Sequence, residues 1–201
     1  MLVEEKGVRI LTDPGTLSTQ QDELKDIHFV LITHEHYDHF HIESVKKVLA
    51  NNPTAQIITN KSVGALLEKE GLAYTLVEDG QSYDAGGVLV EGFGKEHALM
   101  HSSLPRTQNT GYFVGGRLFY PGDAFSNPHK EVDILALPVA GPWMKLSEAI
   151  DYALELKPKV CFPVHDGMLK HIGPVHTVPA MILEPLGIKF IIQEIGKPSE
   201  F

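Results

Sequence analysis

The sequence predicts an α/β fold in which two β-sheets pack face to face and helices lie outside them. Three observations support this prediction. Short, nearly continuous apolar runs recur along the chain, as expected for strands buried on both faces. Strands come first, helices and strands then alternate, and a hairpin leads into a second alternation, which does not fit one doubly wound sheet. The length of 201 residues suits a single domain, residues 1–201, and no linker or repeat divides it.

The first half of the chain is expected to begin with strands and then to alternate. The turn signal Asp-Pro-Gly at 13–15 ends the first strand. The first helix presents apolar side chains on one face, and Pro53 ends it. In order, the expected elements are strands at 8–11 and 26–33, a helix at 42–51, a strand at 56–59, a helix at 63–69, and strands at 74–77 and 88–93.

The second half is expected to open with a hairpin. The pair Gly115-Gly116 predicts its turn, and Pro158 lies just past the end of the helix that follows later. Pro179 falls in the first turn of another helix, where proline is tolerated. In order, the expected elements are strands at 111–114, 117–120 and 132–137, a helix at 146–156, a strand at 159–164, a helix at 175–186 and a strand at 188–192.

The overall charge excludes some classes of partner. The chain has 17 Lys and Arg residues against 26 Asp and Glu residues, a net charge of −9. A nucleic acid binder usually has the opposite sign and a basic patch, so we expect no nucleic acid partner. We see neither an apolar run long enough to cross a bilayer nor a signal peptide, so we expect no membrane partner. The single cysteine, Cys161, excludes an internal disulfide, and together these features favour the cytoplasm.

The 11 histidines of the chain cluster where expected strands end. The strand at 26–33 runs directly into His34, His36, Asp38 and His39. Side chains two residues apart on an extended segment point the same way, so both of the first two imidazoles can reach one metal ion. Asp38 and His39 follow in the loop and can face a second ion. Imidazole and carboxylate ligands together suit Zn²⁺, Fe or Mn²⁺.

Three further candidate ligands follow strands farther along the chain. His97 comes after the strand at 88–93, Asp123 comes after the hairpin in a Pro-Gly-Asp turn, and His165 comes after the strand at 159–164. Each of them alone is commonly a structural residue or part of an ordinary turn. Their joint occurrence with the histidine cluster predicts that all of them converge on one metal centre.

The segment 34–39, His-Glu-His-Tyr-Asp-His, resembles the metallo-β-lactamase superfamily signature His-x-His-x-Asp-His. The later histidine, Gly-Asp pair and histidine also resemble that superfamily in their order and separation, so the resemblance spans nearly the whole chain. The stretches 97–101, 109–112 and 142–145 look like a bacterial branch of the superfamily that is related to L-ascorbate-6-phosphate lactonases.

The resemblance implies a four-layer αββα sandwich with one or two Zn²⁺ ions at one edge of the paired sheets, Mn²⁺ and Fe²⁺ being alternatives. It implies that Asp123 bridges the two ions. His97 and His101 compete for one ligand position. We favour His97 because it lies closer to the strand end, and His101 then faces the substrate or supports a ligand. The implied ligands are His34, His36 and His97 for the first ion, and Asp38, His39 and His165 for the second.

The start of the chain departs from this family. The superfamily usually begins with a pair of strands, whereas residues 8–11 look like the second strand of that pair. We therefore expect a chain that starts inside the domain or has lost its first N-terminal strand. Such a loss would expose a sheet edge and threaten solubility.

The expected chemistry is hydrolysis of a small-molecule ester, lactone or phosphoester by a metal-held hydroxide, because a metal lowers the pKa of bound water from about 16 to about 7. Asp38 and His101 are the expected catalytic residues, and Asp38 orients the water or ligates a metal. Asp13 either orients a metal-bound histidine or only forms a turn. Trp143 either lines the mouth of the site or packs on the core, and Lys145 could attract an anionic substrate group.

Two other functions fit the same ligands. One is an iron-dependent oxidoreductase on the same fold, and the other is a non-catalytic metal-binding protein. A nuclease of the superfamily fits poorly, because the chain is short and acidic. The sequence identifies neither the substrate nor the native metal, and it does not decide between a monomer and a homo-oligomer.

Overall fold

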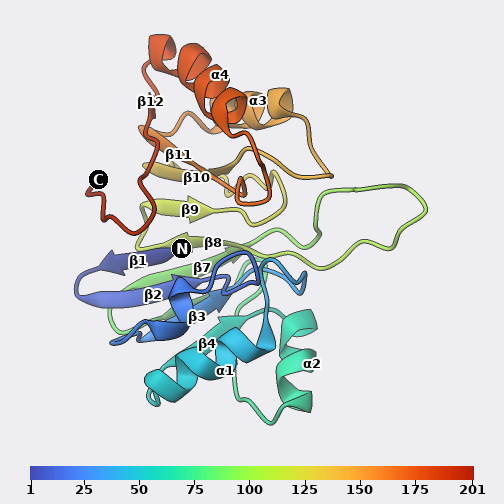
Figure 1. Ribbon diagram of the computed structural model, residues 1–201, viewed down its shortest axis with the longest axis vertical. Coiled ribbons are helices and arrows are strands. Elements are labelled where there is room, and N and C mark those ends of the chain that lie inside the picture. Colours follow the sequence, from blue (N-terminus) through green and yellow to red (C-terminus); the bar gives the residue numbers. More distant parts are fainter.

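Two β-sheets lie face to face in the middle of the molecule, and helices cover the outer face of each (Figure 1). The computed structural model describes residues 1–201. The five-stranded first sheet has the order β1-β2-β3-β4-β5, and the seven-stranded second sheet has the order β12-β11-β10-β9-β8-β7-β6. The first sheet comprises β1 (Leu2–Glu5), β2 (Val8–Thr12), β3 (Phe29–Ile32), β4 (Gln56–Thr59) and β5 (Thr75–Leu76). The second comprises β6 (Ser82–Asp84), β7 (Leu89–Phe93), β8 (Gly111–Val114), β9 (Leu118–Tyr120), β10 (Ile134–Pro138), β11 (Val160–Val164) and β12 (Lys189–Phe190).

The helices divide between the two outer layers. Helices α1 and α2 lie against the first sheet, and α3 and α4 lie against the second (Figure 1). Their bounds are α1 (Ile42–Asn51), α2 (Lys61–Lys69), α3 (Leu146–Leu156) and α4 (Gly173–Leu183), with short 3-10 helices η1 (Gln20–Glu23) and η2 (Glu184–Leu186). The four-layer αββα sandwich predicted from the sequence is thereby confirmed. None of the helices combines the length and the apolar character that crossing a membrane would require.

Three apolar layers hold the four layers together, and they explain the continuous apolar runs in the sequence. Leu31 of β3 points into the core between the sheets, whereas its neighbour Val30 packs with Val45 of α1. In the second sheet, Ala136 faces the core between the sheets, and its neighbour Leu135 belongs to the cluster under α3 and α4. Central strands are therefore apolar on both faces, because successive side chains alternate between two buried layers.

Strand direction brings one end of both sheets to a common edge. In the first sheet β2, β3 and β4 are parallel, and in the second β9, β10 and β11 are parallel. Strand β7 pairs antiparallel with β8, and β8 pairs antiparallel with β9, so β7 runs in the same direction as β9. The long connection from β7 to β8 extends beyond the sheet edge (Figure 1). The loops that follow these strands carry the candidate site.

The chain opens with a hairpin that the sequence analysis did not predict. Strand β1 pairs antiparallel with β2, from Leu2 opposite Leu11 to Glu5 opposite Val8. Lys6 and Gly7 form its turn with φ of 50° and 77°, the left-handed values that a tight hairpin turn requires. If the first strand were lost, β2 would be an exposed edge of the sheet. In the structure, β1 occupies this edge.

Other boundaries shift by a few residues from the predictions. Helix α2 begins at Lys61 because the Asn60 side chain accepts a hydrogen bond from the Val63 N–H at 3.2 Å and caps the helix. The helix expected at 175–186 is α4 followed by η2, with a change of helix type near Pro185. The short elements η1 and β6 were not predicted, since their short and mostly polar sequences give no apolar period.

Candidate metal centre

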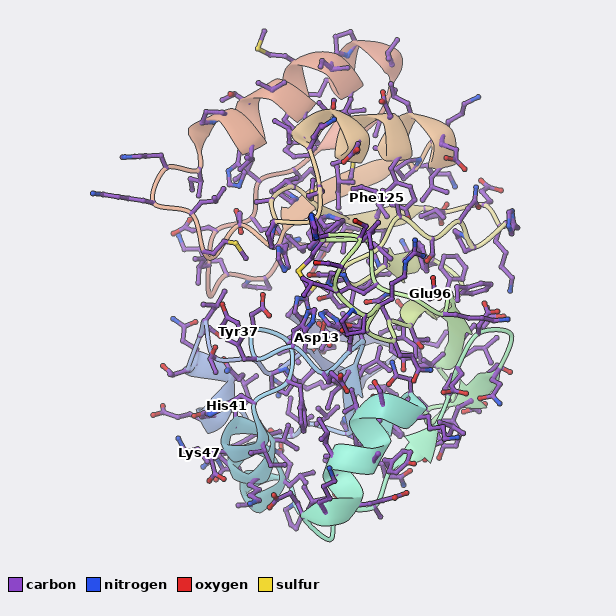
Figure 2. All side chains as sticks on the ribbon, turned by 90° about the vertical axis from the view of Figure 1, so that its right-hand side faces the viewer. Asp13, Tyr37, His41, Lys47, Glu96 and Phe125 are labelled. Carbon is purple, nitrogen blue, oxygen red and sulfur yellow. The ribbon has the colours of Figure 1, made fainter.

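A tight turn after β3 holds the first four candidate ligands. The backbone N–H groups of His39 and Phe40 donate to the His36 carbonyl oxygen at 2.9 and 2.8 Å, which closes the turn. His34 and His39 are buried, whereas Tyr37 in the same turn is 67% exposed. Figure 2 labels Tyr37 and Asp13 at a similar height, between the two helical layers. The turn therefore directs its ligating side chains inward and its tyrosine toward solvent.

The Asp-Pro-Gly turn after β2 packs against this loop. The Thr16 N–H donates to the Tyr37 carbonyl oxygen at 3.0 Å, and the His41 N–H donates to the Pro14 carbonyl oxygen at 3.1 Å. A Cβ atom at Gly15 would lie only 1.7 Å from the Asp38 backbone oxygen. Glycine is required here because the two backbones approach too closely for any side chain.

Four of the predicted ligands form a first group. His34, His36, His97 and Asp123 each offer one ligand atom, and these atoms all lie within 4.8 Å of one another. His34 Nε2 lies 3.1 Å from His36 Nδ1, and His97 Nε2 lies 3.3 Å from Asp123 Oδ2. We call the three histidines of this group, together with Asp123, the first sub-site.

The other three predicted ligands form a second group beside the first. The ligand atoms of Asp38, His39 and His165 also lie within 4.8 Å of one another, and His165 Nε2 is 3.4 Å from Asp38 Oδ2. Asp123 Oδ1 is 3.1 Å from His39 Nε2, and Asp123 Oδ2 is 3.1 Å from His165 Nε2. We call Asp38, His39, His165 and Asp123 the second sub-site. Asp123 touches both sub-sites, as a bridging ligand would.

The donor atoms fit a metal ion because several of them lack any other partner. His39 Nε2, His165 Nε2 and Asp123 Oδ1 are buried without a hydrogen-bond partner. Buried polar atoms are nearly always hydrogen-bonded, so three unpartnered atoms facing one another need a cation or water between them. Neutral imidazole nitrogens and carboxylate oxygens are ligands of Zn²⁺, Mn²⁺ and Fe²⁺.

Asp13 supports the second sub-site from behind. Its Oδ2 atom accepts hydrogen bonds from His39 Nδ1 at 2.6 Å, from the Tyr120 hydroxyl at 2.6 Å and from the Thr33 hydroxyl at 2.7 Å. The Thr33 N–H donates to Oδ1 at 2.8 Å. A carboxylate that accepts from Nδ1 leaves Nε2 of His39 as the free ligand atom. The sequence left two alternatives for Asp13: it orients a metal-bound histidine, or it only forms a turn. The structure shows that Asp13 contacts His39, a candidate ligand, as the first alternative requires.

Neutral groups support the remaining histidines. His34 Nδ1 donates to the Thr33 hydroxyl oxygen at 2.9 Å, and His36 Nε2 lies 3.3 Å from the Thr107 hydroxyl. His97 Nδ1 donates to the Ala98 carbonyl oxygen at 2.6 Å. These bonds fix the ring orientations and turn one nitrogen of each ring toward the centre of the cluster.

Two residues of the loop between β10 and α3 support the remaining ligands. His165 Nδ1 donates to the Ala140 carbonyl oxygen at 2.7 Å, which leaves Nε2 facing the cluster. The Trp143 indole N–H donates to Asp123 Oδ2 at 2.9 Å. Of the two positions predicted for Trp143, lining the mouth or packing on the core, the structure shows the packed position, because the side chain is buried. Its indole also contacts the candidate ligand Asp123.

Carboxylates raise the pKa of the histidines in the second sub-site. Burial alone would lower the pKa of His39, but the hydrogen bond to Asp13 and the nearby carboxylates of Asp13 and Asp123 raise it to about 10. Burial opposes the same rise at His165, where the nearby carboxylates of Asp123 and Asp38 raise the pKa to about 9. Both imidazole rings are therefore positively charged at neutral pH, with a proton on each nitrogen, unless a metal ion displaces the proton on Nε2.

The opposite holds in the first sub-site. Burial lowers the pKa of His34 well below its ordinary value and lowers that of His36, and neighbouring imidazoles add to both effects. Although burial favours the protonated acid, the close approach of His165, His39 and His97 holds the pKa of Asp123 well below its ordinary value. In the first sub-site, His34 and His36 thus offer neutral imidazoles beside the ionised carboxylate of Asp123.

Two residues singled out in the sequence lie outside the cluster. His101 is exposed in the β7–β8 connection, where its Nδ1 atom pairs with the Ser103 hydroxyl at 2.7 Å. His97, not His101, joins the candidate ligands. Lys145 is exposed directly before α3, where its N–H donates to the Glu148 carboxylate at 2.7 Å. The substrate-facing roles of both residues stay predictions.

Sequence reasoning missed the groups that orient the ligands. It gave no role to Tyr120, Thr33 or Thr107, although each contacts a candidate ligand or Asp13. A weak signal was available for two of them, because Thr33 directly precedes His34 and Tyr120 directly precedes the Pro-Gly-Asp turn. Residues that precede ligands at strand ends are placed to support them.

Comparisons with known proteins agree with this geometry. The family model described as beta-lactamase superfamily domain matches residues 1–165. The Mycobacterium tuberculosis protein Rv0786c is 34% identical over 174 residues, which cover 84% of this chain and 81% of that protein. A UPF0173 metal-dependent hydrolase of Methylacidiphilum infernorum is 32% identical over 173 residues, covering 77% and 71%. The structure of Igni18, a metallo hydrolase from Ignicoccus hospitalis, superposes with a TM-score of 0.76 at 22% identity, covering 98% and 91%. The proposed lactonase-related branch stays a prediction.

Proposed function

This chain belongs to the beta-lactamase superfamily, and we propose that it is a metal-dependent hydrolase of a small ester, lactone or phosphoester. One observation carries the proposal: seven His and Asp side chains from four loops converge at one edge of the sandwich, and three of their atoms have no hydrogen-bond partner in the protein. Relatives that are named metal-dependent hydrolases support it.

We assign one or two Zn²⁺ ions to the centre, with Mn²⁺ and Fe²⁺ as alternatives. His34, His36 and His97 would hold the first ion, Asp38 and His39 with His165 the second, and Asp123 both. When bound, such ions lower the pKa of water from about 16 toward 7 and so supply a nucleophile at neutral pH.

The residues of the chain would prepare this chemistry in distinct ways. The Asp38 side chain is 11% exposed and the Asp123 side chain 4%, so Asp38 is the carboxylate that an incoming water can still reach. Asp38 would orient that water and accept a hydrogen bond from it, in addition to ligating. Asp123, held by Trp143, would keep both sub-sites at a fixed separation.

The position of the centre supports a small substrate that enters from the loop side. His101 on the projecting β7–β8 connection would approach the substrate from one side of the mouth. Lys145, two residues after Trp143, would attract an anionic group of the substrate. Whether the reacting centre is a carbonyl or a phosphoryl group is decided by the activity panel below.

The test is His36→Ala with His171→Ala as its matched control. His171 is exposed and lies outside the ligand cluster. We expect His36→Ala to lose the first metal ion and hydrolysis together, as measured by elemental analysis and by turnover of esters, lactones and phosphoesters with added Zn²⁺, Mn²⁺ or Fe²⁺. His171→Ala should retain both properties. Unchanged metal content in His36→Ala would reject the ligand assignment. Metal binding by the wild-type protein without turnover of any substrate would reject the proposed hydrolase function.

A further inference from the structure

A buried histidine lies outside the ligand cluster and has a carboxylate partner. His176 of α4 has a side chain that is 9% exposed, and its Nε2 atom lies 2.6 Å from Asp166 Oδ2. The side chain of Asp166 is 28% exposed, so the bond is largely shielded from water. Neither residue belongs to the first or the second sub-site.

Asp166 follows His165 directly, so this bond acts next to a candidate ligand. The loop from Asp166 to Ile172 connects β11 to α4, and most of its residues are exposed. Its one backbone hydrogen bond is local, from the Leu169 N–H to the Asp166 carbonyl oxygen at 2.9 Å. Within this loop only Asp166 makes a side-chain hydrogen bond, and that bond anchors the loop to the outer helical layer (Figure 1).

The backbone of His165 needs such an anchor. Its φ is 65°, in the left-handed region that non-glycine residues rarely adopt. Strained conformations of this kind persist only where the surrounding structure imposes them. The ring is held on one side by its Nδ1 bond to the Ala140 carbonyl oxygen at 2.7 Å. On the other side, the bond between Asp166 and His176 restrains the next residue of the chain.

We propose that His176 is a positioning residue of the metal centre, which acts through Asp166 to hold the backbone that presents His165 to the second sub-site. This inference rests on the proposed metal centre. Without the bond, the loop would relax toward ordinary dihedral angles, and His165 Nε2 would leave its place 3.1 Å from Asp123 Oδ2. The first sub-site, whose histidines come from other loops, would keep its geometry.

The experiment titrates metal-free protein with Co²⁺ and follows the visible absorption bands, whose position and intensity report the coordination of each ion. Chelator competition gives the two successive affinities. We expect His176→Leu and Asp166→Ala each to weaken binding of one of the two ions by about 10- to 100-fold and to alter its spectrum. The double variant should be no worse than either single variant, because both remove the same bond.

Two further variants separate positioning from other effects. Asp166→Asn keeps an oxygen that accepts from His176 Nε2, so it should restore nearly wild-type affinity and spectrum. His171→Leu removes an exposed histidine from the same loop and should change neither. If His176→Leu fails to fold, the comparison of Asp166→Ala with Asp166→Asn carries the test, since Asp166 is partly exposed.

Two results would overturn the inference alone: two ions bound by His176→Leu with wild-type affinity and spectrum, or equal losses in Asp166→Asn and Asp166→Ala. Failure of the wild-type protein to bind Co²⁺ would instead overturn the proposed metal centre, and this inference with it.

Discussion

The two sub-sites of the centre have similar ligands but differ in what stands behind them. Neutral hydroxyl and carbonyl groups support the histidines of the first sub-site, and burial lowers the pKa of His34 and His36. In the second sub-site the Asp13 side chain contacts His39 on the side away from the cluster, and carboxylates raise the pKa of both histidines. We infer that the first sub-site is prepared to accept an ion without losing a proton, whereas the second must release protons to bind one.

Among substitutions that leave every candidate ligand in place, the largest effect is expected from Asp13→Asn. Asparagine tolerates the left-handed backbone at this position, where φ is 44°, but it removes the charge that faces His39. The affinity of the second sub-site should fall by about 10- to 100-fold, and that of the first should change less, because Asp13 reaches His34 only through Thr33. Chelator competition in the wild-type and His36→Ala backgrounds measures the two separately. Equal losses at both sub-sites would remove the basis of the comparison.

A second expectation concerns pH. His39 and His165 have pKa values raised to about 10 and about 9, so protons compete with the ion at neutral pH. Affinity of the second sub-site should rise between pH 6 and pH 8 by roughly tenfold per pH unit for each proton displaced, while the first sub-site changes little. Calorimetric titration in buffers of different ionisation enthalpy would count the released protons. If both ions bound with the same pH dependence, the predicted difference in protonation between the two sub-sites would be wrong.

The same shifts predict the sign of a stability change in metal-free protein. A raised pKa in the folded state stabilises the fold fully below the unfolded value of 6.5, and this contribution is lost as the pH rises toward about 10. Denaturant unfolding of chelated protein should show stability that falls as the pH rises across this range, and constant or rising stability would contradict the prediction.

The smallest effect is expected from Thr107→Val, which sharpens the comparison from the other side. The hydroxyl of Thr107 lies 3.3 Å from His36 Nε2, a long contact between neutral groups. Removing it should weaken the first sub-site by at most about tenfold and leave the second unchanged, as chelator competition would show. A larger loss would mean that the β7–β8 connection supports the centre more strongly than the geometry indicates.

The candidate ligands could be predicted from sequence because their signals are local. His34, His36 and His165 each follow an apolar strand, and parallel strands bring such residues to one edge. The four layers could be predicted for the same reason, since alternating burial on both faces leaves continuous apolar runs.

The supporting groups could not be predicted, because their contacts join distant parts of the chain. Tyr120 and Asp13 are 107 residues apart, and Thr107 and His36 are 71 residues apart. The position of Tyr120 beside the Pro-Gly-Asp turn is a weak signal of a supporting role, but nothing in the sequence identifies the distant partner of Tyr120 or of Thr107. Strand β1 was missed for a different reason: Glu4 and Glu5 give it a polar composition, and its pairing with β2 depends on the backbone.

The division of the chain between the two sheets has a consequence for cohesion. Residues up to Leu76 build the first sheet and supply His34 to His39, whereas residues from Ser82 onward build the second and supply Asp123 and His165. An ion held by ligands from both parts of the chain would link the N-terminal part, which builds the first sheet, to the C-terminal part, which builds the second. The free energy of ion binding would then stabilise the packing of the two sheets against each other. Chelation of the ion would weaken this packing before it disturbed either sheet.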